Sequence, residues 1–137
     1  MALAAQKLAT FYGGFVHVWA PCPETMGDYR ITVLPGDGTG REVALEAQKI
    51  LDTIAANTNH GFDQTVIPCG GQHYLSTGEE WAPGSFEFCR DETDAIFLGA
   101  IGQPGALLPN GDLAGGSVIL GLRSGLDLYA NVRPIKL

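Results

Sequence analysis

The sequence of 137 residues has few cysteines, and they form no recognisable pattern. Cys22, Cys69 and Cys89 are widely spaced, include no C-x-x-C pair and leave an odd count. Disulfide-rich secreted domains and thiolate metal sites both need paired or closely spaced cysteines. The spacing therefore argues against both classes and favours a reducing compartment, so we expect a cytoplasmic protein.

Positive charge and long apolar runs are also scarce. Eight Lys and Arg stand against fifteen Asp and Glu, which gives a net charge of −7. Nucleic-acid binding draws on clustered cations, and a membrane span needs about 18 consecutive apolar residues. We therefore expect neither nucleic acid nor a membrane as a partner, and any anion site must be local.

Common nucleotide-binding and hydrolase motifs are missing as well. The glycines at 36, 38 and 40 lack the Lys of a P-loop, and Arg41 stands where a dinucleotide fingerprint needs glycine. What is present is a short apolar strand from Ile31 to Leu34, a glycine turn and a helix start. On spacing alone, a turn and a ligand-binding loop are equally good interpretations of these glycines.

The pattern after the glycine loop predicts an α/β protein. A helical stripe comprises Val43, Ala47, Ile50, Leu51 and Ile54. Further strands are expected at 62–68, 94–99 and 128–132, with helices at 83–90 and 117–126. This order favours a sheet that is parallel through its first three strands, with right-handed crossovers. The 94–99 strand is continuously apolar, so we expect it to be buried on both faces.

Residues 1–28 differ from the rest, since Met1 to Ala20 contains one Lys, one His and no acid. They match neither a signal peptide nor a mitochondrial presequence, so we expect a poorly ordered leader before a single domain at 29–137. Within that domain, the loops after Leu34 and Leu98 follow carboxyl ends of parallel strands, where α/β sheets bind ligands. We expect the two loops to share one edge and one ligand site.

Arg123 and Arg133 are the candidate anion-binding residues. At helical spacing Ile119 and Leu120 lie on the same face as Arg123, which suits a small carboxylate bearing an alkyl group. A second guanidinium would let the pair bind a diacid. The alternative is that Arg123 is a solvated residue paired with Asp127.

Acids in the predicted loops include Asp37 and Glu80. Capping and solubility are the common roles of such residues. Nothing in the sequence completes a catalytic set.

Four motifs together resemble the amino-terminal part of the isocitrate/isopropylmalate dehydrogenase family, the β-decarboxylating dehydrogenases. They are Leu34-Pro-Gly-Asp-Gly-Thr-Gly40, Cys69-Gly-Gly71 with Thr77-Gly78, Leu98-Gly-Ala-Ile-Gly-Gln-Pro104, and the run from Leu122 to Leu137. The resemblance implies NAD-dependent oxidative decarboxylation of a 2-hydroxy diacid, with Mg²⁺ or Mn²⁺ polarising the reacting oxygen.

The resemblance also implies residue roles. Substrate binding falls to Arg123, Arg133, Ile119 and Leu120, and cofactor binding to Thr39, Gly102 and Gln103.

Departures from the family pattern bear on the substrate. Isopropylmalate-specific members typically carry Glu seven positions before the first arginine, where this chain has Gly116. Isocitrate-specific members tend to have Ser and Asn six and four positions before it, and here these are Ser117 and Ile119. The apolar pocket favours 3-isopropylmalate, in leucine biosynthesis, with tartrate or D-malate as the alternative.

Family enzymes are much longer, and the resemblance implies that the catalytic Tyr and Lys, the metal ligands and the adenine-binding loop follow Leu137. We therefore expect a partial isopropylmalate-dehydrogenase-like sheet with flanking helices, lacking the segments that complete it and leaving apolar surface uncovered. By itself such a chain would be inactive. The parent enzyme is expected to be a homodimer, and the rival interpretation is a non-catalytic truncated fragment.

Overall fold

The computed structural model describes residues 27–128 and residue 133, and these residues form a three-stranded sheet with helices on both sides. The sheet order is β2-β1-β3, and both pairings are parallel, as the sequence predicts. The elements are β1 Asp28–Leu34, α1 Thr39–Asn57, β2 Gly61–Val66, α2 Gly71–Thr77, α3 Ser85–Asp91, β3 Ala95–Leu98 and α4 Gly116–Gly125.

Strand β1 is the centre of the fold. It pairs with β2 on one side and β3 on the other, and its residues from Ile31 to Leu34 are all buried. Successive side chains of a strand point to opposite faces, so Ile31 and Val33 supply one core and Leu34 supplies the other. The apolar run before the glycine loop is therefore explained by its central place.

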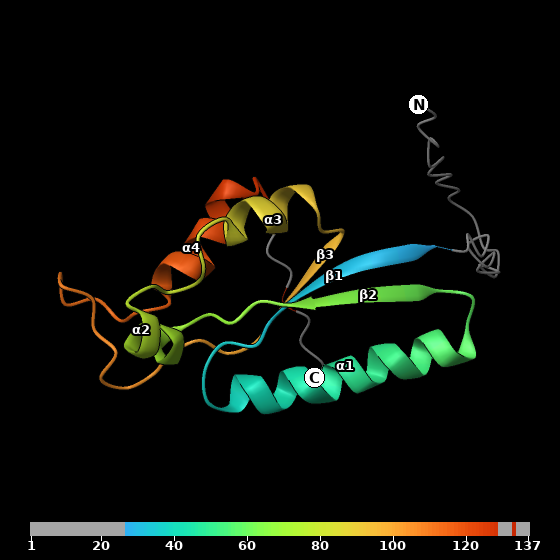
Figure 1. Cartoon of the computed structure of the whole chain (residues 1–137), viewed down its shortest axis with the longest axis horizontal. Helices are drawn as coiled ribbons and strands as arrows, with labels where there is room; N and C mark the ends of the chain where they lie inside the picture. The colour runs from blue at the N-terminus through green and yellow to red at the C-terminus, as the bar shows by residue number, and fades with distance from the viewer. Residues whose placement is uncertain (1–26, 129–132, 134–137) are drawn as a thin grey trace, which may run out of the picture.

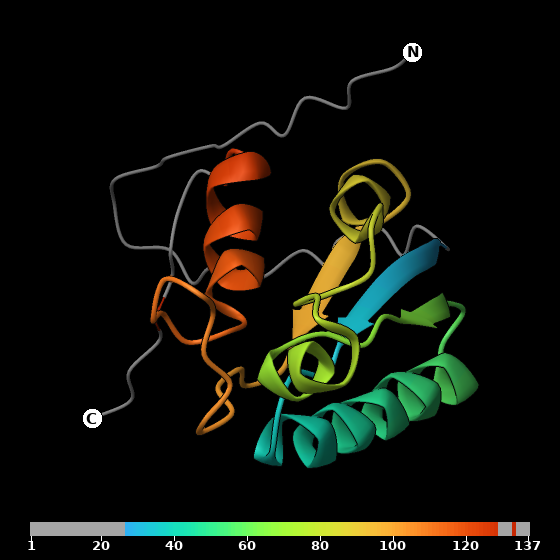
Figure 2. The same ribbon diagram turned by 60° about the vertical axis from the view of Figure 1, so that its left-hand side comes forward.

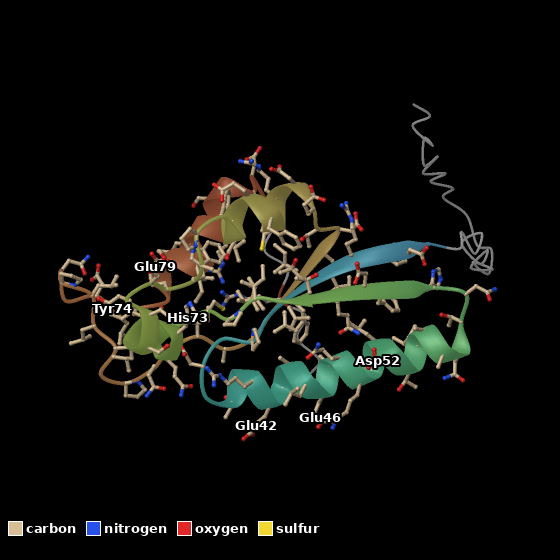
Figure 3. The ribbon with its side chains drawn as sticks, viewed as in Figure 1. Glu42, Glu46, Asp52, His73, Tyr74 and Glu79 are labelled. Carbon is tan, nitrogen blue, oxygen red and sulfur yellow. The ribbon has the colours of Figure 1, made fainter. Side chains whose placement is uncertain are left out.

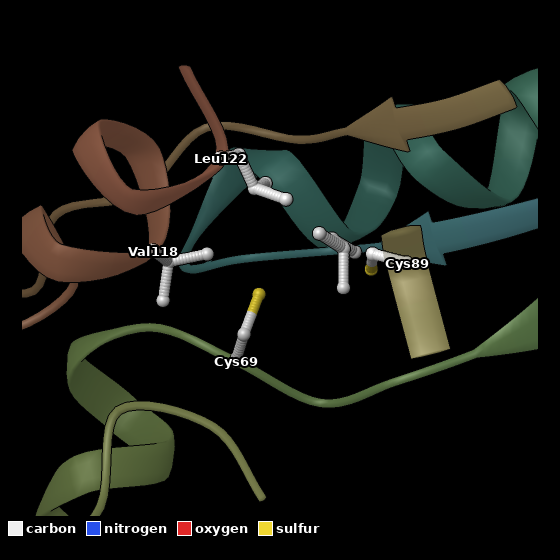
Figure 4. Close-up of a cluster of buried hydrophobic side chains, with 5 residues drawn as sticks. Cys69, Cys89, Val118 and Leu122 are labelled. Atoms are coloured by element: carbon white, nitrogen blue, oxygen red, sulfur yellow. The ribbon is translucent and has the colours of Figure 1, made fainter. Parts of the chain in front are cut away.

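Helices cover the two faces of the sheet unequally (Figures 1 and 2). Helix α1 lies along one face, and α3 and α4 lie over the other. The core between the sheet and α3 and α4 contains Leu34, Cys69, Cys89, Val118 and Leu122, as Figure 4 shows in part. The second core, under α1, is smaller. The result is a three-layer arrangement in which Val118 and Leu122 join α4 to the core on this face of the sheet.

The face that α1 turns toward the sheet differs from the predicted stripe. Ala44 is buried and Leu51 packs on the second core, whereas Val43, Ile50 and Ile54 are exposed. Small residues face the sheet because they let the helix approach it closely. The larger side chains on the neighbouring face are left without cover among the described residues. On the outer side, Glu42 and Glu46 point away from the sheet (Figure 3).

The prediction that the third strand is buried on both faces was wrong. In β3, Ala95 and Leu98 are exposed, and Ile96 and Phe97 are half-buried. Among the described residues β3 has a neighbour only on its β1 side, so it is an edge strand. Its apolar residues reflect a surface left uncovered in this part of the fold.

Element boundaries otherwise follow the sequence within a few residues. Helix α2 was not predicted, because its residues show no clear helical period. Asp28, placed in the leader by sequence, already belongs to β1, and residues 1–26 lie outside the described residues. The predicted strand at 128–132 also lies almost entirely outside them. Within the described ranges, no helix has the length and apolar character needed to cross a membrane.

Candidate functional site

One buried carboxylate joins the loops at the carboxyl edge of the sheet. Asp37 lies in the loop after β1 and is 3% exposed. Its carboxylate accepts hydrogen bonds from the backbone N–H groups of Gly71 at 2.8 Å, Gln72 at 2.8 Å and Gly102 at 2.9 Å. Its own N–H donates to the carbonyl oxygen of Ala100 at 2.7 Å. The loops after β1 and β3 therefore share one edge, as expected.

The environment of Asp37 favours its ionised form. Burial opposes the charge and would raise its pKa, but the N–H groups of Gln72, Gly102 and Gly71 outweigh that effect, with a smaller contribution from Arg41. The net result is a pKa below the ordinary value of an aspartate. Two of the donors open α2, so Asp37 caps that helix from a distant part of the chain, and its predicted capping role is confirmed.

The glycines of the first loop serve mainly to bring two backbones together. A Cβ at Gly36 would lie 2.1 Å from the Ala100 carbonyl oxygen, and one at Gly40 would lie 2.5 Å from that of Pro35. A Cβ at Gly99 would lie 2.1 Å from the same Pro35 oxygen. These positions are therefore filled by the neighbouring loop. Of the two interpretations left open by the spacing, the structure favours the turn for Gly36 and Gly40.

Open backbone remains beside these contacts. Gly38 and Gly102 have positive φ values of 49° and 148°, and an added Cβ would meet nothing within 4 Å at either position. Thr39 is exposed at the first residue of α1. Gln103 is half-buried beside Gly71. A Cβ added at Gly71 would lie 2.7 Å from the Cβ of Gln103. The candidate cofactor-binding residues thus lie around the Asp37 junction.

The candidate substrate-binding residues of α4 lie on its outer side. Val118 and Leu122 are buried against the sheet, Ile119 is half-buried, and Leu120 and Arg123 are exposed. Among residues 27–128 and 133, Arg123 forms no ion pair, with Asp127 or with any other acid. The helix therefore presents an apolar surface and a guanidinium toward solvent.

A second loop acid holds the start of α4. The carboxylate of Glu80 accepts hydrogen bonds from the Gly115 N–H and the Ser117 hydroxyl, and from the Ser117 N–H at 3.4 Å. Gly115 is the N-cap of α4. The capping role expected for Glu80 is confirmed, but its partner lies 35 residues away, and no local sequence signal identifies such a long-range cap.

Arg133 is exposed, and its neighbours at 129–132 and 134–137 lie outside the described residues. Its pairing with Arg123 on a diacid therefore stays a prediction. Within the described part of the chain, no group of three or more His, Cys, Asp or Glu could hold a metal ion.

Comparison with known proteins identifies the fold. The model of the isocitrate/isopropylmalate dehydrogenase family matches residues 30–137. The chain belongs to this family. It is 39% identical over 111 residues to 3-isopropylmalate dehydrogenase of Gloeobacter violaceus and 40% identical over 114 residues to that of a Synechococcus species. These alignments cover 81% and 82% of this chain.

A solved structure supports the same family. The apo form of a β-decarboxylating dehydrogenase from Thermococcus kodakarensis is 31% identical and has a TM-score of 0.56, covering 74% of this chain and 27% of that one. The two curated relatives are covered to 30% and 31% of their length. The chain thus spans about three-tenths of the curated relatives that it matches, and its α/β sheet is part of a dehydrogenase fold.

Proposed function

We propose that this chain contributes the substrate-carboxylate site of an NAD-dependent dehydrogenase that oxidatively decarboxylates a 2-hydroxy diacid. The proposed substrate is 3-isopropylmalate, and the alternative is tartrate or D-malate. The chain would act in the cytoplasm, as part of a longer, homodimeric enzyme. Family membership and the names of its relatives support the reaction class. By itself the chain would be inactive.

The observation that carries this proposal is the outer face of α4. Arg123 stands exposed beside Leu120, which is 63% exposed, and Ile119. A guanidinium binds a carboxylate through two parallel N–H donors, and the apolar neighbours suit an alkyl substituent. Ile119 and Leu120 lie four and three positions before Arg123, so the three residues share one face of the helix. Arg133 would bind the second carboxylate.

The open backbone near Asp37 fits the nicotinamide half of a dinucleotide. Thr39, Gly102 and Gln103 would hold it, since a Cβ at Gly102 would meet no atom within 4 Å and Thr39 is exposed. A bound NAD would supply the acceptor for the hydride that leaves the hydroxyl-bearing carbon. This chain would hold the backbone at Gly102 in place, because the Gly102 N–H donates a hydrogen bond to the Asp37 carboxylate at 2.9 Å.

The described residues do not fit the divalent cation that the family resemblance implies. They contain no group of His, Cys, Asp or Glu that could hold Mg²⁺ or Mn²⁺. This part of the chain therefore supplies no ligand set for the metal.

Calorimetry of the chain with 3-isopropylmalate, D-malate and tartrate tests the proposal. Arg123→Ala should weaken binding of the preferred diacid by about tenfold or more, because a charge-assisted hydrogen-bonded pair contributes roughly 1.5–3 kcal/mol. Lys49→Ala is the matched control, since it removes one exposed cation from α1 and should change nothing. A preference for D-malate or tartrate would assign the alternative substrate class.

The rival proposal is a non-catalytic fragment that associates through uncovered apolar surface. The exposed side chains of α1 and of the loops favour it, and they include Val43, Leu45, Ile50, Leu107 and Leu113. Equal binding of diacids by the parent chain and by Arg123→Ala, or no binding by either, would support this rival.

A further inference from the structure

We propose that a groove beside the first turns of α1 binds a small carboxylate that carries an apolar chain. The groove lies between one face of α1, the loop after β1 and the segment that links β2 to α2 (Figure 1). Ile119, Leu120 and Arg123 of α4 are not among the residues that line it. The groove is therefore a second site, and it goes beyond the proposed function.

The walls of this groove are largely apolar. Ala44 and Cys69 form its floor, and each is 1% exposed. Leu45 and Val66 stand at its mouth, with exposed fractions of 60% and 49%. Its volume is about 380 Å³, and small-molecule sites, which are mostly apolar with a few polar groups, occupy roughly 300–1,000 Å³. The groove is thus large enough for an alkyl chain, which would leave water on entering it.

A cation borders the groove. Arg41 lies in the first turn of α1, and Ala44 and Leu45 follow it by three and four positions, so all three share one face of the helix. The Nε of Arg41 donates a hydrogen bond to the Gly36 carbonyl oxygen at 3.3 Å, which holds the guanidinium beside the groove. Among residues 27–128 and 133, Arg41 forms no ion pair. Its remaining N–H groups can therefore bind a carboxylate.

The acids near Arg41 leave this cation open to a ligand. Asp37 is 3% exposed, and three backbone N–H groups hold its carboxylate. Glu42 and Glu46, which follow on α1, point away from the sheet (Figure 3). Arg41 itself is exposed. The protein therefore presents its positive charge, rather than these carboxylates, beside the groove.

Shape and charge together specify the ligand. The Arg41 guanidinium would pair with the carboxylate at the rim, and the alkyl chain would lie between Leu45 and Val66. An organic cation would be repelled by Arg41. A diacid of similar length would bring its second charge among apolar side chains, which is costly for a charge without a partner. The groove therefore favours a monocarboxylate, in contrast to the diacid proposed for Arg123.

Calorimetry of the full chain with octanoate, hexanoate and octylamine tests the ligand chemistry. Octanoate should bind, and hexanoate should bind about tenfold more weakly, because its shorter chain buries less apolar surface. Octylamine has a similar chain with the opposite charge and should show no binding. Equal binding of octanoate and octylamine, or no binding of octanoate, would overturn the proposal.

Replacement of Arg41 tests the role of the cation. Arg41→Gln should weaken octanoate binding by about tenfold or more, because a charge-assisted pair is lost. Arg41→Lys keeps the charge and should keep most of the affinity. Lys49→Gln is the matched control, since it removes an exposed cation from α1 that does not line the groove, and it should change nothing. Unchanged affinity in Arg41→Gln, or an equal loss in Lys49→Gln, would contradict the assignment.

A charge at the mouth of the groove tests its apolar wall. Leu45→Asp should abolish octanoate binding, because it places a like charge beside the carboxylate. Leu75→Asp is the control, since Leu75 is 59% exposed on α2 and does not line the groove. Circular dichroism shows whether each variant is folded, and the comparison of octanoate with octylamine on the unmodified chain decides the question where one is not.

Two further outcomes would assign the ligand or the groove differently. If Arg123→Ala abolishes octanoate binding and Arg41→Gln does not, octanoate occupies the proposed diacid site. The groove proposal then fails and the proposed function stands. If octanoate does not bind but Leu45→Asp lowers self-association in sedimentation velocity, a second copy of the chain occupies the groove. The proposal fails in that case as well, whereas diacid binding through Arg123 is unaffected by either result.

Discussion

At the scale of single residues, Asp37 illustrates how one side chain can organise several loops. It belongs to the glycine loop that is the most visible motif of the sequence, yet its main effect is to satisfy backbone donors from two other segments. The loop therefore acts through its acid as much as through its glycines. This explains why the glycine spacing alone could not decide between a turn and a ligand site.

Replacing Asp37 by alanine should destabilise the chain by about 2–4 kcal/mol, because three N–H donors would lose a charged acceptor in a buried place. Urea denaturation monitored by circular dichroism measures the loss. Asp112→Ala is the control. Asp112 is an exposed loop acid whose carboxylate accepts a hydrogen bond from Asn110, and its removal should cost about 0.5 kcal/mol or less. Similar losses in the two variants would contradict the role assigned to Asp37.

The contribution of Asp37 should also depend on pH. Because its pKa is lowered in the folded state, the stabilisation is fully present above its unfolded pKa of about 4 and is lost as the pH falls through the folded pKa. The difference in unfolding free energy between the parent chain and Asp37→Asn should therefore be constant near neutral pH and shrink below about pH 4. A difference that does not change with pH would show that the ionised form is not what matters.

At the scale of elements, the two loops at the sheet edge pack backbone against backbone. Gly40 lies in the first turn of α1, and a Cβ there would be 2.5 Å from the Pro35 oxygen and 2.6 Å from the Ala100 nitrogen. Helix propensity and loop packing thus make opposite predictions for an alanine at this position.

We expect the loop packing to outweigh helix propensity, so Gly40→Ala should destabilise the chain by more than about 1 kcal/mol. In a helix interior without such a contact, alanine is usually more stable than glycine by roughly 1 kcal/mol. Gly121→Ala is the matched control, since Gly121 lies within α4 and an added Cβ would meet nothing within 4 Å. That variant should be more stable by up to about 1 kcal/mol. Thermal melting of Gly40→Ala and Gly121→Ala shows whether each substitution lowers or raises the stability of the chain. Stabilisation by both substitutions would disprove the close packing of the loops.

Sequence patterns predicted elements well where the determinants are local. The stretch from Ile31 through the glycine loop into α1 is set by neighbouring residues, and the parallel order of the first three strands follows from their alternation with helices. The shared edge of the two loops follows from that order. Burial was predicted less well, because whether β3 or the Ile50 side of α1 is covered depends on segments distant in sequence.

In the candidate site, too, local features were predicted from sequence and long-range contacts were not. The α4 face bearing Ile119 and Arg123 is visible from helical spacing alone. The contacts of Glu80 with Gly115 and Ser117 are not, since they join residues 35 and 37 positions apart through a loop of irregular shape. Only the folded chain brings that acid to the end of α4.

At the scale of the whole molecule, the described residues leave much apolar surface uncovered. Ile50 is 61% exposed on α1, and Val43 and Ile54 share its side of the helix. Exposed apolar side chains that lie together favour association in water. The family fold is larger than this chain, and about three-tenths of each curated relative is matched. The surface is thus expected to be covered either by further parts of the fold or by other molecules.

A charge placed on this surface separates association from folding. Ile50→Glu should lower self-association of the 137-residue chain, measured by sedimentation velocity over a range of concentrations. The free energy of unfolding should change by about 0.5 kcal/mol or less, because the Ile50 side chain is largely solvated. Leu51→Glu is the matched control on the same helix. It faces the core beneath α1, so it should destabilise the chain strongly. If Ile50→Glu unfolds the chain as Leu51→Glu does, Ile50 is buried and α1 packs on the sheet through the apolar stripe predicted from sequence. If it folds but associates unchanged, the α1 surface is not the one through which chains meet.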